Sequence, residues 1–538
     1  MRPRCPLRRV AVLGGGPGGL YAARLLKLAR PDCDVVVHEQ GVPDQTFGFG
    51  VGLAARTQRR LAEADPASLD DILAAAWSHD MRMRVGDREA GMDVNALVAI
   101  GRAELLRVLQ HHADDAGVKL EFGTRRAADD LDADLVIAAD GVGSATRAAG
   151  AFGAEVEVGS GWYLWAGVDV ALPHALFAPE RTEHGVFVTH AYPYAPDRST
   201  FLVETDEATW RKAGFGESTA TTPADASDAV ALEYLSDVFA RHLDGHRLIG
   251  NRTRWLQFRT VRCARWHDGR VVLLGDAAHT AHYSVGSGTK LAMEDAIALV
   301  DALDSSDDLA TALAAYEDAR RPAVTRIQDI AERSRRWWET FPERLDLPVE
   351  QLLVAYMSRA GNVPLDRFAA GTPDVVATAL RQWAGEDPPA EGSLVEWALE
   401  RALRPSSPGQ EPDLDAVDEP VGTRGFDGRV VPDDPAALGA TVLDLGADDR
   451  PAGREQTVED GVRRGAGIID CVWLTGGDDR ASVLTRLEVA ERLRRRTPAL
   501  VVVVGPHGLR ADLADGLAAD RTHLVAFRGE RSGGGDGR

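Results

Sequence analysis

The chain has 538 residues, of which 44% are hydrophobic and 27% charged, and this size predicts about two to four globular domains. Its formal net charge of −22 disfavours general binding of nucleic acid or of an anionic membrane surface. No apolar run approaches the roughly 18–20 residues that span a bilayer, so we expect a cytoplasmic protein without a membrane segment. The four cysteines are scattered without a CxxC pair, which argues against a disulfide framework and against a metal site.

The first elements in chain order predict a βαβ unit. Residues 10–13 form an apolar strand, GGGPGG a turn, LYAARLLKLAR a helix, and DVVVHE a second strand that ends at Glu39. In this setting Gly14-x-Gly16-x-x-Gly19 favours dinucleotide binding, because these glycines allow a tight turn, close approach of a pyrophosphate and close helix packing. Glu39 would accept hydrogen bonds from a ribose. FAD and NAD both fit this pattern, and a plain glycine-rich loop is the structural alternative.

Two further motifs place an acid and a glycine at strand ends. DLVIAADGVGSATR carries Asp140 and Gly141, and VVLLGDAAH carries Gly275 and Asp276. A structural turn alone would explain an Asp-Gly pair. Between the fingerprint and these motifs, an amphipathic helix, GRAELLRVLQHHADDAG, opens with Arg102.

The residue composition changes twice along the chain. Residues 155–260 carry aromatic and β-branched residues at short spacing and predict an inserted mixed β-sheet. A later segment rich in proline, glycine and acid predicts a linker, and strand and helix patterns return after it. The expected domains are a dinucleotide-binding domain (1–155 and 262–385), a substrate-binding sheet (156–261), a linker (386–422), a small C-terminal α/β module (423–530) and a disordered tail (531–538).

The three motifs, in this order and at these distances, resemble those of class A FAD-dependent aromatic hydroxylases, which share the para-hydroxybenzoate hydroxylase fold. FGFGVGL, HAYPY and RWHDGRVVLLGDAAHTAHYSVGSGTKLAMEDAIAL are similar to the monooxygenase part of salicylyl-CoA 5-hydroxylase and anthraniloyl-CoA monooxygenase, with similarity over about residues 8–380. The resemblance implies an α/β fold in which a Rossmann-like FAD-binding domain carries an inserted mixed β-sheet. It also implies hydroxylation of an aromatic ring with NADH or NADPH and O₂, through a flavin C4a-hydroperoxide.

The resemblance also implies which residues contact FAD. Gly286, Ser287 and Gly288 lead into a helix whose N-terminal N–H groups would face the negative charge of the reduced flavin. The remaining expected contacts are Gly14, Gly16, Gly19, Glu39, Arg102, Asp140, Gly141, Gly275 and Asp276.

His282 and Tyr283 are the expected catalytic residues, because they would lie near the flavin edge. A base matters for a phenol substrate, since deprotonation makes the ring more nucleophilic, whereas an aniline needs none. For His279, directly after the GD turn, a structural role is favoured. The expected substrate wall, for which core packing is an equal alternative, is Phe49, Trp165, His190, Tyr192 and Tyr194.

Two departures from the family pattern leave alternatives open. Tyr283 stands where the resemblance leads us to expect phenylalanine. Larger family members continue into a (β/α)₈ barrel of about 250 residues, and the tail here is too short for one, so we interpret it as a degenerate remnant.

The substrate and the role of the tail also remain open. The substrate is an aryl thioester of CoA or a carrier protein, or else a free indole or another aromatic. A CoA complex would need a basic patch such as the arginines of residues 333–336. A flavin-bearing scaffold whose C-terminal module docks a partner is the alternative of another class, and a simple NAD-dependent dehydrogenase is the weakest hypothesis. A homodimer is an assembly that we leave open.

Overall fold

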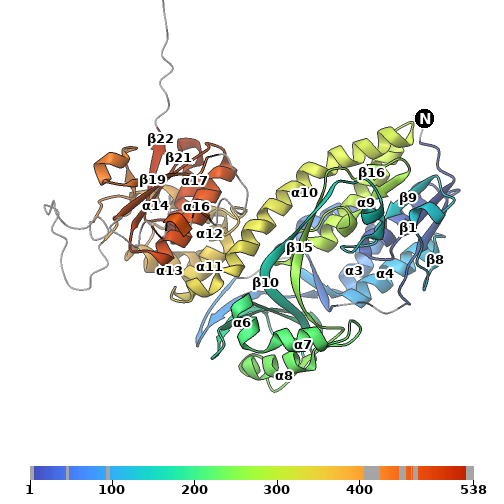
Figure 1. Cartoon of the computed structure of the whole chain (residues 1–538), viewed down its shortest axis with the longest axis horizontal. Coiled ribbons are helices and arrows are strands. Elements are labelled where there is room, and N and C mark those ends of the chain that lie inside the picture. The colour runs from blue at the N-terminus through green and yellow to red at the C-terminus, as the bar shows by residue number, and fades with distance from the viewer. Residues whose placement is uncertain are drawn as a thin grey trace, which may run out of the picture. The chain divides into compact units, whose positions relative to one another are not determined.

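The computed structural model describes residues 5–43, 46, 48–92, 97–404, 425–446, 456–457, 459–461, 463 and 470–528. The chain divides into two compact units, Met1–Thr340 and Phe341–Arg538 (Figure 1). This division lies before the expected domain limit at residue 385, because the helices that follow Thr340 cluster with the C-terminal sheet. Both units combine helices with β-sheets, so the expected α/β class is confirmed.

A six-stranded sheet forms the first half of the N-terminal unit. Its strands pair in parallel, except for the antiparallel edge pair β16–β17. In spatial order they are β16 (His267–Asp268), β17 (Val271–Leu273), β9 (Leu135–Ala138), β1 (Arg9–Leu13), β2 (Asp34–His38) and β8 (Lys119–Glu121). The expected βαβ unit is β1, α1 and β2.

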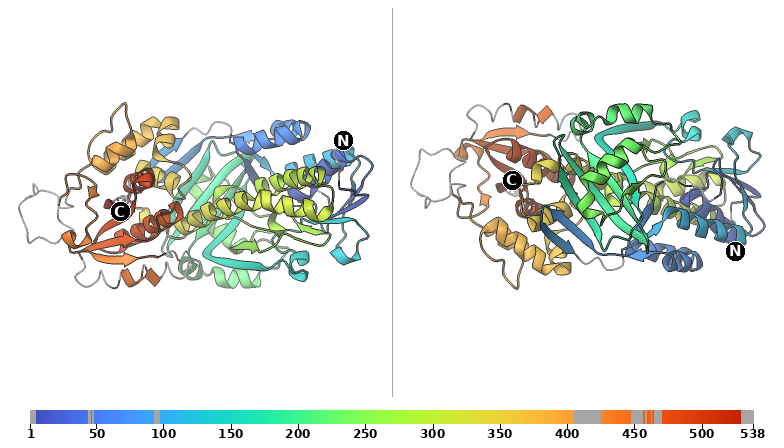
Figure 2. Two further views of the ribbon diagram at one scale, coloured as in Figure 1. Left: turned by 90° about the horizontal axis from the view of Figure 1, so that it is seen from above. Right: turned by 90° about the horizontal axis from the view of Figure 1, so that it is seen from below.

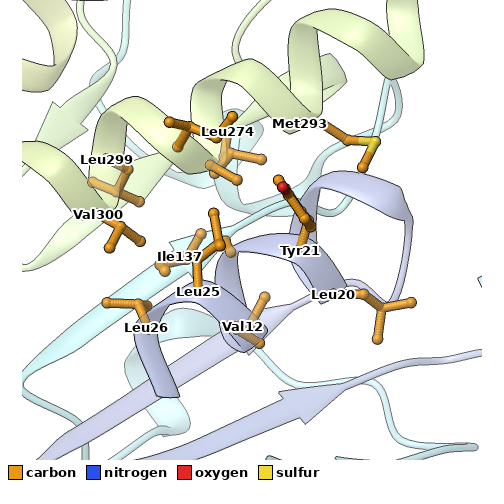
Figure 3. Packing of buried hydrophobic residues seen from close by; sticks show 14 of the residues in the cluster. Val12, Leu20, Tyr21, Leu25, Leu26, Ile137, Leu274, Met293, Leu299 and Val300 are labelled. Atoms are coloured by element: carbon orange, nitrogen blue, oxygen red, sulfur yellow. The ribbon is translucent and has the colours of Figure 1, made fainter. Parts of the chain in front are cut away.

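Two helices, α1 (Pro17–Ala29) and α9 (Gly288–Ser305), pack together on this sheet. Figure 3 shows Tyr21 and Leu25 of α1 and Leu299 of α9 within one buried cluster. A Cβ at Gly18 would lie 2.9 Å from the Ala292 Cβ, so the helices can approach this closely only with glycine in α1. The other helices of this half are α2 (Ala55–Ala64), α3 (Pro66–Ala74), α4 (Arg102–Asp115), α5 (Ala145–Ala149) and α10 (Leu309–Glu339).

An eight-stranded sheet forms the second half of this unit. Seven strands follow the order β14 (Leu248–Ile249), β10 (Ala154–Val168), β13 (Arg198–Thr205), β12 (Val186–Ala195), β11 (Ala175–Arg181), β5 (Met81–Val85) and β6 (Arg88–Met92), and β15 (Trp255–Cys263) pairs with β10. The sheet therefore includes β5 and β6, which precede the expected insertion. A small sheet of β3 (Gly50–Leu53), β7 (Val98–Gly101) and β4 (Trp77–Ser78) completes the unit.

The two faces of the eight-stranded sheet have different neighbours. Helices α6 (Glu207–Lys212), α7 (Phe215–Thr221) and α8 (Ala229–Val238) cover one face, where alternate residues such as Leu164, Phe187 and Val203 form a buried core (Figure 2). Because successive side chains of a strand point to opposite faces, Tyr163, His190 and Glu204 belong to the other face. That face provides the wall of the site described below.

The C-terminal unit holds a five-stranded sheet in which every pair is parallel. Its order is β18 (Val430–Val431), β22 (Leu524–Arg528), β21 (Leu500–Pro506), β20 (Cys471–Thr475) and β19 (Thr441–Asp444). Its helices are α11 (Val349–Ser358), α12 (Leu365–Gly371), α13 (Pro373–Ala384), α14 (Leu394–Glu400), α16 (Arg480–Arg496) and α17 (Arg510–Ala518).

Helix α14 lies inside the expected linker. It forms because Val395, Trp397 and Leu399 are buried apolar side chains, and Ser393 caps its first turn. The rest of the expected linker, from residue 405, and the tail at 531–538 lie outside the described residues. Within the described part of the chain, no helix is long and apolar enough to cross a membrane.

Candidate active site

The glycine turn after β1 leaves open space at one position only. Gly14 has a φ of +106°, and a Cβ there would lie 2.3 Å from the carbonyl oxygen of Ala139. A Cβ at Gly19 would lie 2.1 Å from the carbonyl oxygen of Gly14. A Cβ at Gly16, in contrast, meets no atom within 4 Å. The fold itself therefore requires Gly14 and Gly19, whereas Gly16 borders space that a diphosphate can approach.

Glu39 follows β2 and lies against this turn. Its two carboxylate oxygens accept hydrogen bonds from the backbone N–H groups of Gly15 and Gly41, both at 2.6 Å. These bonds fix the carboxylate beside the N-terminus of α1, the position expected for a ribose contact.

Asp140 follows β9 and has one unpartnered oxygen. Its Oδ2 accepts hydrogen bonds from the backbone N–H and the hydroxyl of Thr146, both at 3.1 Å. Its Oδ1 is buried, and no described residue is its hydrogen-bond partner. Gly141 has a φ of +79°, and a Cβ there would meet no atom within 4 Å. A buried acceptor beside an open glycine suits a ligand hydroxyl or N–H group.

The GD turn after β17 is held from behind by Asp295 of α9. The Asp295 carboxylate accepts hydrogen bonds from the Gly275 N–H at 3.1 Å and from His279 Nε2 at 2.8 Å, and it pairs with Arg320 at 2.7 Å. Burial acts to raise the pKa of Asp295, but His279 and Arg320 outweigh it and lower that pKa. His279 therefore fixes the turn, as its favoured structural role predicts.

Asp276 of the same turn lies near Arg102 and the first residue of α9. Its side chain is exposed to solvent, yet surrounding protein raises its pKa by desolvation. Arg102, the first residue of α4, attracts this carboxylate, and burial lowers the pKa of Arg102. Helix α9 begins at Gly288, where a Cβ would lie 3.9 Å from Asp276 Oδ1, and the Ser287 hydroxyl is buried with no hydrogen-bond partner among the described residues.

These residues fit the FAD that the family resemblance implies. The open space at Gly16 and the N-terminus of α1 suit a diphosphate, which binds helix N-termini. The unpartnered Asp140 Oδ1 and Ser287 Oγ, together with the exposed Asp276, supply polar groups that a ribityl chain and a flavin ring can satisfy.

An aromatic cluster stands beside the GD turn. His282 Nδ1 lies 2.8 Å from the Ser284 hydroxyl, which lies 2.7 Å from the Ser334 hydroxyl of α10. Burial and the neighbouring Glu204 carboxylate raise the pKa of Tyr283 well above its usual value. The rings with centroids 4.0–6.4 Å from the Tyr283 ring are those of His282, Tyr163, Phe258, Trp165 and His190.

The structure separates the five expected wall residues. Trp165 and His190 face Tyr283, both at 6.4 Å between ring centroids. Phe49 is buried against β10, where a Cβ at Gly167 would lie 2.3 Å from its ring. The other two tyrosines pack on β3: the Tyr192 hydroxyl donates to the Gly50 carbonyl at 2.7 Å, and a Cβ at Gly50 would lie 2.8 Å from the Tyr194 ring.

Two of the three arginines at residues 333–336, the patch expected for CoA, do not face solvent. Arg335 and Arg336 are buried, and both pair with Glu332, at 2.5 and 2.8 Å. Arg335 also pairs with Glu157 at 3.1 Å and with Glu339 at 2.7 Å. These two positive charges are therefore neutralised within the unit, which does not favour CoA binding by Arg335 and Arg336.

One residue of the wall was not predicted from the sequence. Glu204 lies on β13 opposite Tyr163 of β10, and its Oε1 is 3.3 Å from His190 Nε2. The alternation of residues in FLVETDE could have predicted this position. Phe201 and Val203 face the core, so Glu204 must face the site.

Comparison with known proteins agrees with this site. The family model described as FAD binding domain matches residues 8–331. Salicyloyl-CoA 5-hydroxylase of Streptomyces sp is 45% identical over 343 residues, which cover 62% of this chain but only 66% of that protein. The 3-hydroxy-4-methyl-anthranilyl-[aryl-carrier protein] 5-monooxygenase of Streptosporangium sibiricum is 41% identical over 362 residues, 66% of this chain and 95% of that protein.

A solved structure shows the same fold. The crystal structure of a variant of 2-methyl-3-hydroxypyridine-5-carboxylic acid oxygenase superposes with a TM-score of 0.52 at 23% identity, covering 66% of this chain and 96% of that one.

A Rossmann-like sheet with a glycine turn, a DG motif and a GD motif beside an aromatic wall defines a class of flavoproteins that hold FAD next to an aromatic substrate. The chain belongs to the FAD binding domain family, among its FAD-dependent aromatic monooxygenases, for which NAD(P)H is the typical co-substrate. The predictions of FAD as cofactor and of this enzyme class are confirmed.

Proposed function

We propose that this protein hydroxylates an aromatic ring that is presented as a thioester of CoA or of a carrier protein. The observation that carries the proposal is that two relatives, at 45% and 41% identity, act by name on an aryl group bound to CoA and on one bound to an aryl-carrier protein.

The names of these relatives also favour one ring position. Both enzymes act at carbon 5, which is para to the C2 hydroxyl of a salicyloyl group and para to the C2 amino group of an anthranilyl group. A hydroxyl or amino group donates electron density to the para carbon. We therefore propose a substrate ring that carries such a donor para to the carbon receiving oxygen.

Different residues of the site would bind the cofactor and position the substrate ring. Bound FAD supplies oxygen activation and transfer. The glycine turn and the N-terminus of α1 hold the diphosphate, while Asp276 and Ser287 bind the remaining polar groups of the cofactor. Tyr163, Trp165 and Tyr283 form an apolar wall that positions the ring and excludes water.

The test compares thioesters with free acids. The purified holoenzyme is assayed for NAD(P)H oxidation with salicyloyl-CoA, anthraniloyl-CoA and the corresponding free acids, and the product is located by mass and NMR spectroscopy. We expect thioesters to stimulate oxidation at least about tenfold more than the acids, with oxygen at carbon 5, since remote binding energy supports turnover. Equal stimulation by free acids, or reduced oxygen recovered only as peroxide, would contradict the proposal.

We further propose that the C-terminal unit is an incomplete (β/α)₈ barrel. Strands β19 to β22 are parallel neighbours in chain order, and the first strand, β18, pairs with the last, β22, as the first and last strands of a closed barrel do. We propose a docking role for this unit in the presentation of a carrier-bound substrate. A chain ending at Thr340 that keeps turnover of aryl-CoA but loses carrier-bound substrate would support that role.

A further inference from the structure

The wall of the site holds a carboxylate among aromatic rings. On the face away from α6–α8, β10 presents Tyr163 and Trp165, β12 presents His190, and β13 presents Glu204. Burying a carboxylate costs several kcal/mol unless it gains partners, so a wall that only packed against a ring would not need one.

Glu204 faces two groups that can carry a proton. Its Oε1 lies 3.3 Å from His190 Nε2, and its negative charge raises the pKa of the neighbouring Tyr283. The Trp338 ring, with its centroid 4.1 Å from that of His190, closes the far side of the imidazole. Glu204 keeps 12% of its side chain exposed, although its Oε1, which faces His190, is buried.

The phenols of the wall are unsuited to act as ionised bases. Burial raises the pKa of Tyr163 to about 12 and raises that of Tyr283 well above its usual value. Both hydroxyls therefore stay protonated at neutral pH, and they can donate a hydrogen bond to a carboxylate but cannot remove a proton as phenolates.

The other charged groups near this cluster interact with other residues. Glu339 of α10 accepts hydrogen bonds from Arg335 and from the backbone N–H groups of Ser160 and Gly161. Arg259 of β15 and Asp276 of the GD turn act on Tyr163. Of the carboxylates near Tyr283, Glu204 is therefore the one that combines exposure with proton-carrying neighbours.

We propose that Glu204, paired with His190, accepts the proton of the ring donor and thereby selects aromatic substrates that carry a hydroxyl or amino group. For a hydroxyl, the O–H bond breaks, the proton passes to a Glu204 oxygen, and the electron pair stays on the ring oxygen. The proton returns to that oxygen before the product leaves. For an amino group, an N–H donates a hydrogen bond to the same carboxylate without proton transfer. This inference rests on the proposed function.

The test replaces the carboxylate by an amide of the same shape in the full-length holoenzyme. Glu204→Gln should keep the FAD content and the rate of flavin reduction by NAD(P)H. It should lower coupled hydroxylation of salicyloyl-CoA about 100-fold or more, the usual loss for a general base, and anthraniloyl-CoA turnover far less. It should also remove the decline of wild-type activity at acidic pH, because no carboxylate remains to be protonated.

A binding measurement separates this inference from the proposed function. Bound salicyloyl-CoA should show the long-wavelength absorption of a phenolate in the wild type at neutral pH, and Glu204→Gln should lose it. Because no turnover is needed, the band tests Glu204 even if thioester hydroxylation fails. A missing band in the wild type, or an equal band in the variant, would overturn the inference.

Two further variants serve as controls for Glu204→Gln. Glu204→Asp keeps an acid and should retain part of the band, which answers the objection that Glu204→Gln misfolds. Glu183→Gln changes an 84% exposed acid between β11 and β12 and should behave as the wild type. Full coupling in Glu204→Gln with salicyloyl-CoA would refute the assignment.

Discussion

Both units contain a mainly parallel sheet, but the residues at the carboxyl ends of the strands differ between them. In the N-terminal unit, β1, β9 and β17 end at the glycine turn, the DG motif and the GD motif, where open space and unpartnered oxygens remain. In the C-terminal unit, Arg528 at the end of β22 donates hydrogen bonds to the Thr475 hydroxyl at 2.5 Å and to the Gly476 carbonyl at 2.7 Å, and it pairs with Asp478. A parallel sheet thus offers a ligand site only where small residues keep its edge open.

The units also differ in their use of buried charge. The N-terminal unit uses Asp295 to hold a cofactor turn, whereas the C-terminal unit uses Glu491 to join helices. Glu491 pairs with Arg344 at 2.6 Å and with Arg521 at 3.2 Å. Burial alone would raise the pKa of Glu491, but these arginines lower it to about 2. The predictions below run from the largest expected change in the free energy of unfolding to the smallest.

Glu491→Gln should have the largest effect. It leaves the buried arginines Arg344 and Arg521 without their carboxylate, which should lower the free energy of unfolding of the C-terminal unit by about 4–5 kcal/mol. Chemical denaturation followed by circular dichroism measures the loss. Glu396→Gln, which breaks an exposed pair with Arg510, should cost less than about 0.5 kcal/mol, and equal losses in the two variants would contradict the comparison.

Asp295→Asn should affect the N-terminal unit instead. It leaves Arg320 buried without its main charge partner and loosens the GD turn, at a cost of about 3–4 kcal/mol. FAD affinity, measured by fluorescence titration, should fall with stability. Glu294→Gln removes the weaker, 3.3 Å contact to the same arginine and should cost less. Unchanged FAD affinity in Asp295→Asn would show that the turn does not depend on this support.

Asp515→Asn should change how the stability of the C-terminal unit depends on pH. Burial raises the pKa of Asp515 to about 7, and its Oδ1 accepts a hydrogen bond from the Leu365 N–H at 3.1 Å, which asparagine can keep. Since the folded pKa exceeds the unfolded one, this acid stabilises the fold fully below about pH 4, and that stability is lost as pH rises through 7.

The variant should therefore remove this slope and be more stable than the wild type at pH 8 by roughly 2–3 kcal/mol. Urea denaturation from pH 4 to pH 8 gives the result. Parallel pH profiles for the two proteins would exclude Asp515 as the titrating group.

The positions of the expected cofactor contacts follow from the sequence more directly than those of the expected substrate wall. Three of these contacts can be recognised in the sequence, namely Gly14, Asp140 and Asp276. The backbone geometry of a tight turn, or the end of a strand, allows only a few residue types at each of these positions. Tyr192 and Tyr194 share the face of His190 on β12 but pack on β3, because the spacing along a strand does not reveal which neighbouring element covers each part of that face. The place of Glu204 in the site can be predicted only once the strand pairing shows which face of the sheet lines the site.

The C-terminal unit was less predictable for a similar reason. The composition of residues 386–422 suggests a linker, but the apolar side chains of α14 are buried by tertiary packing. Likewise the pairing of β18 with β22 joins residues about a hundred positions apart, which no local pattern specifies.

The smallest change in stability should accompany the most complete loss of cofactor, in Gly16→Val. A Cβ at Gly16 meets no protein atom within 4 Å, so the unfolding temperature of the cofactor-free protein should not change, while the side chain fills the space that the diphosphate needs. Gly371→Val in α12 also adds a side chain into open space, but away from the glycine turn, and serves as the matched control.

Flavin absorbance per mole of folded protein is the deciding measurement. We expect full occupancy in the wild type and in Gly371→Val, and none in Gly16→Val. Full flavin occupancy in Gly16→Val would contradict the assignment of the glycine turn as the FAD site.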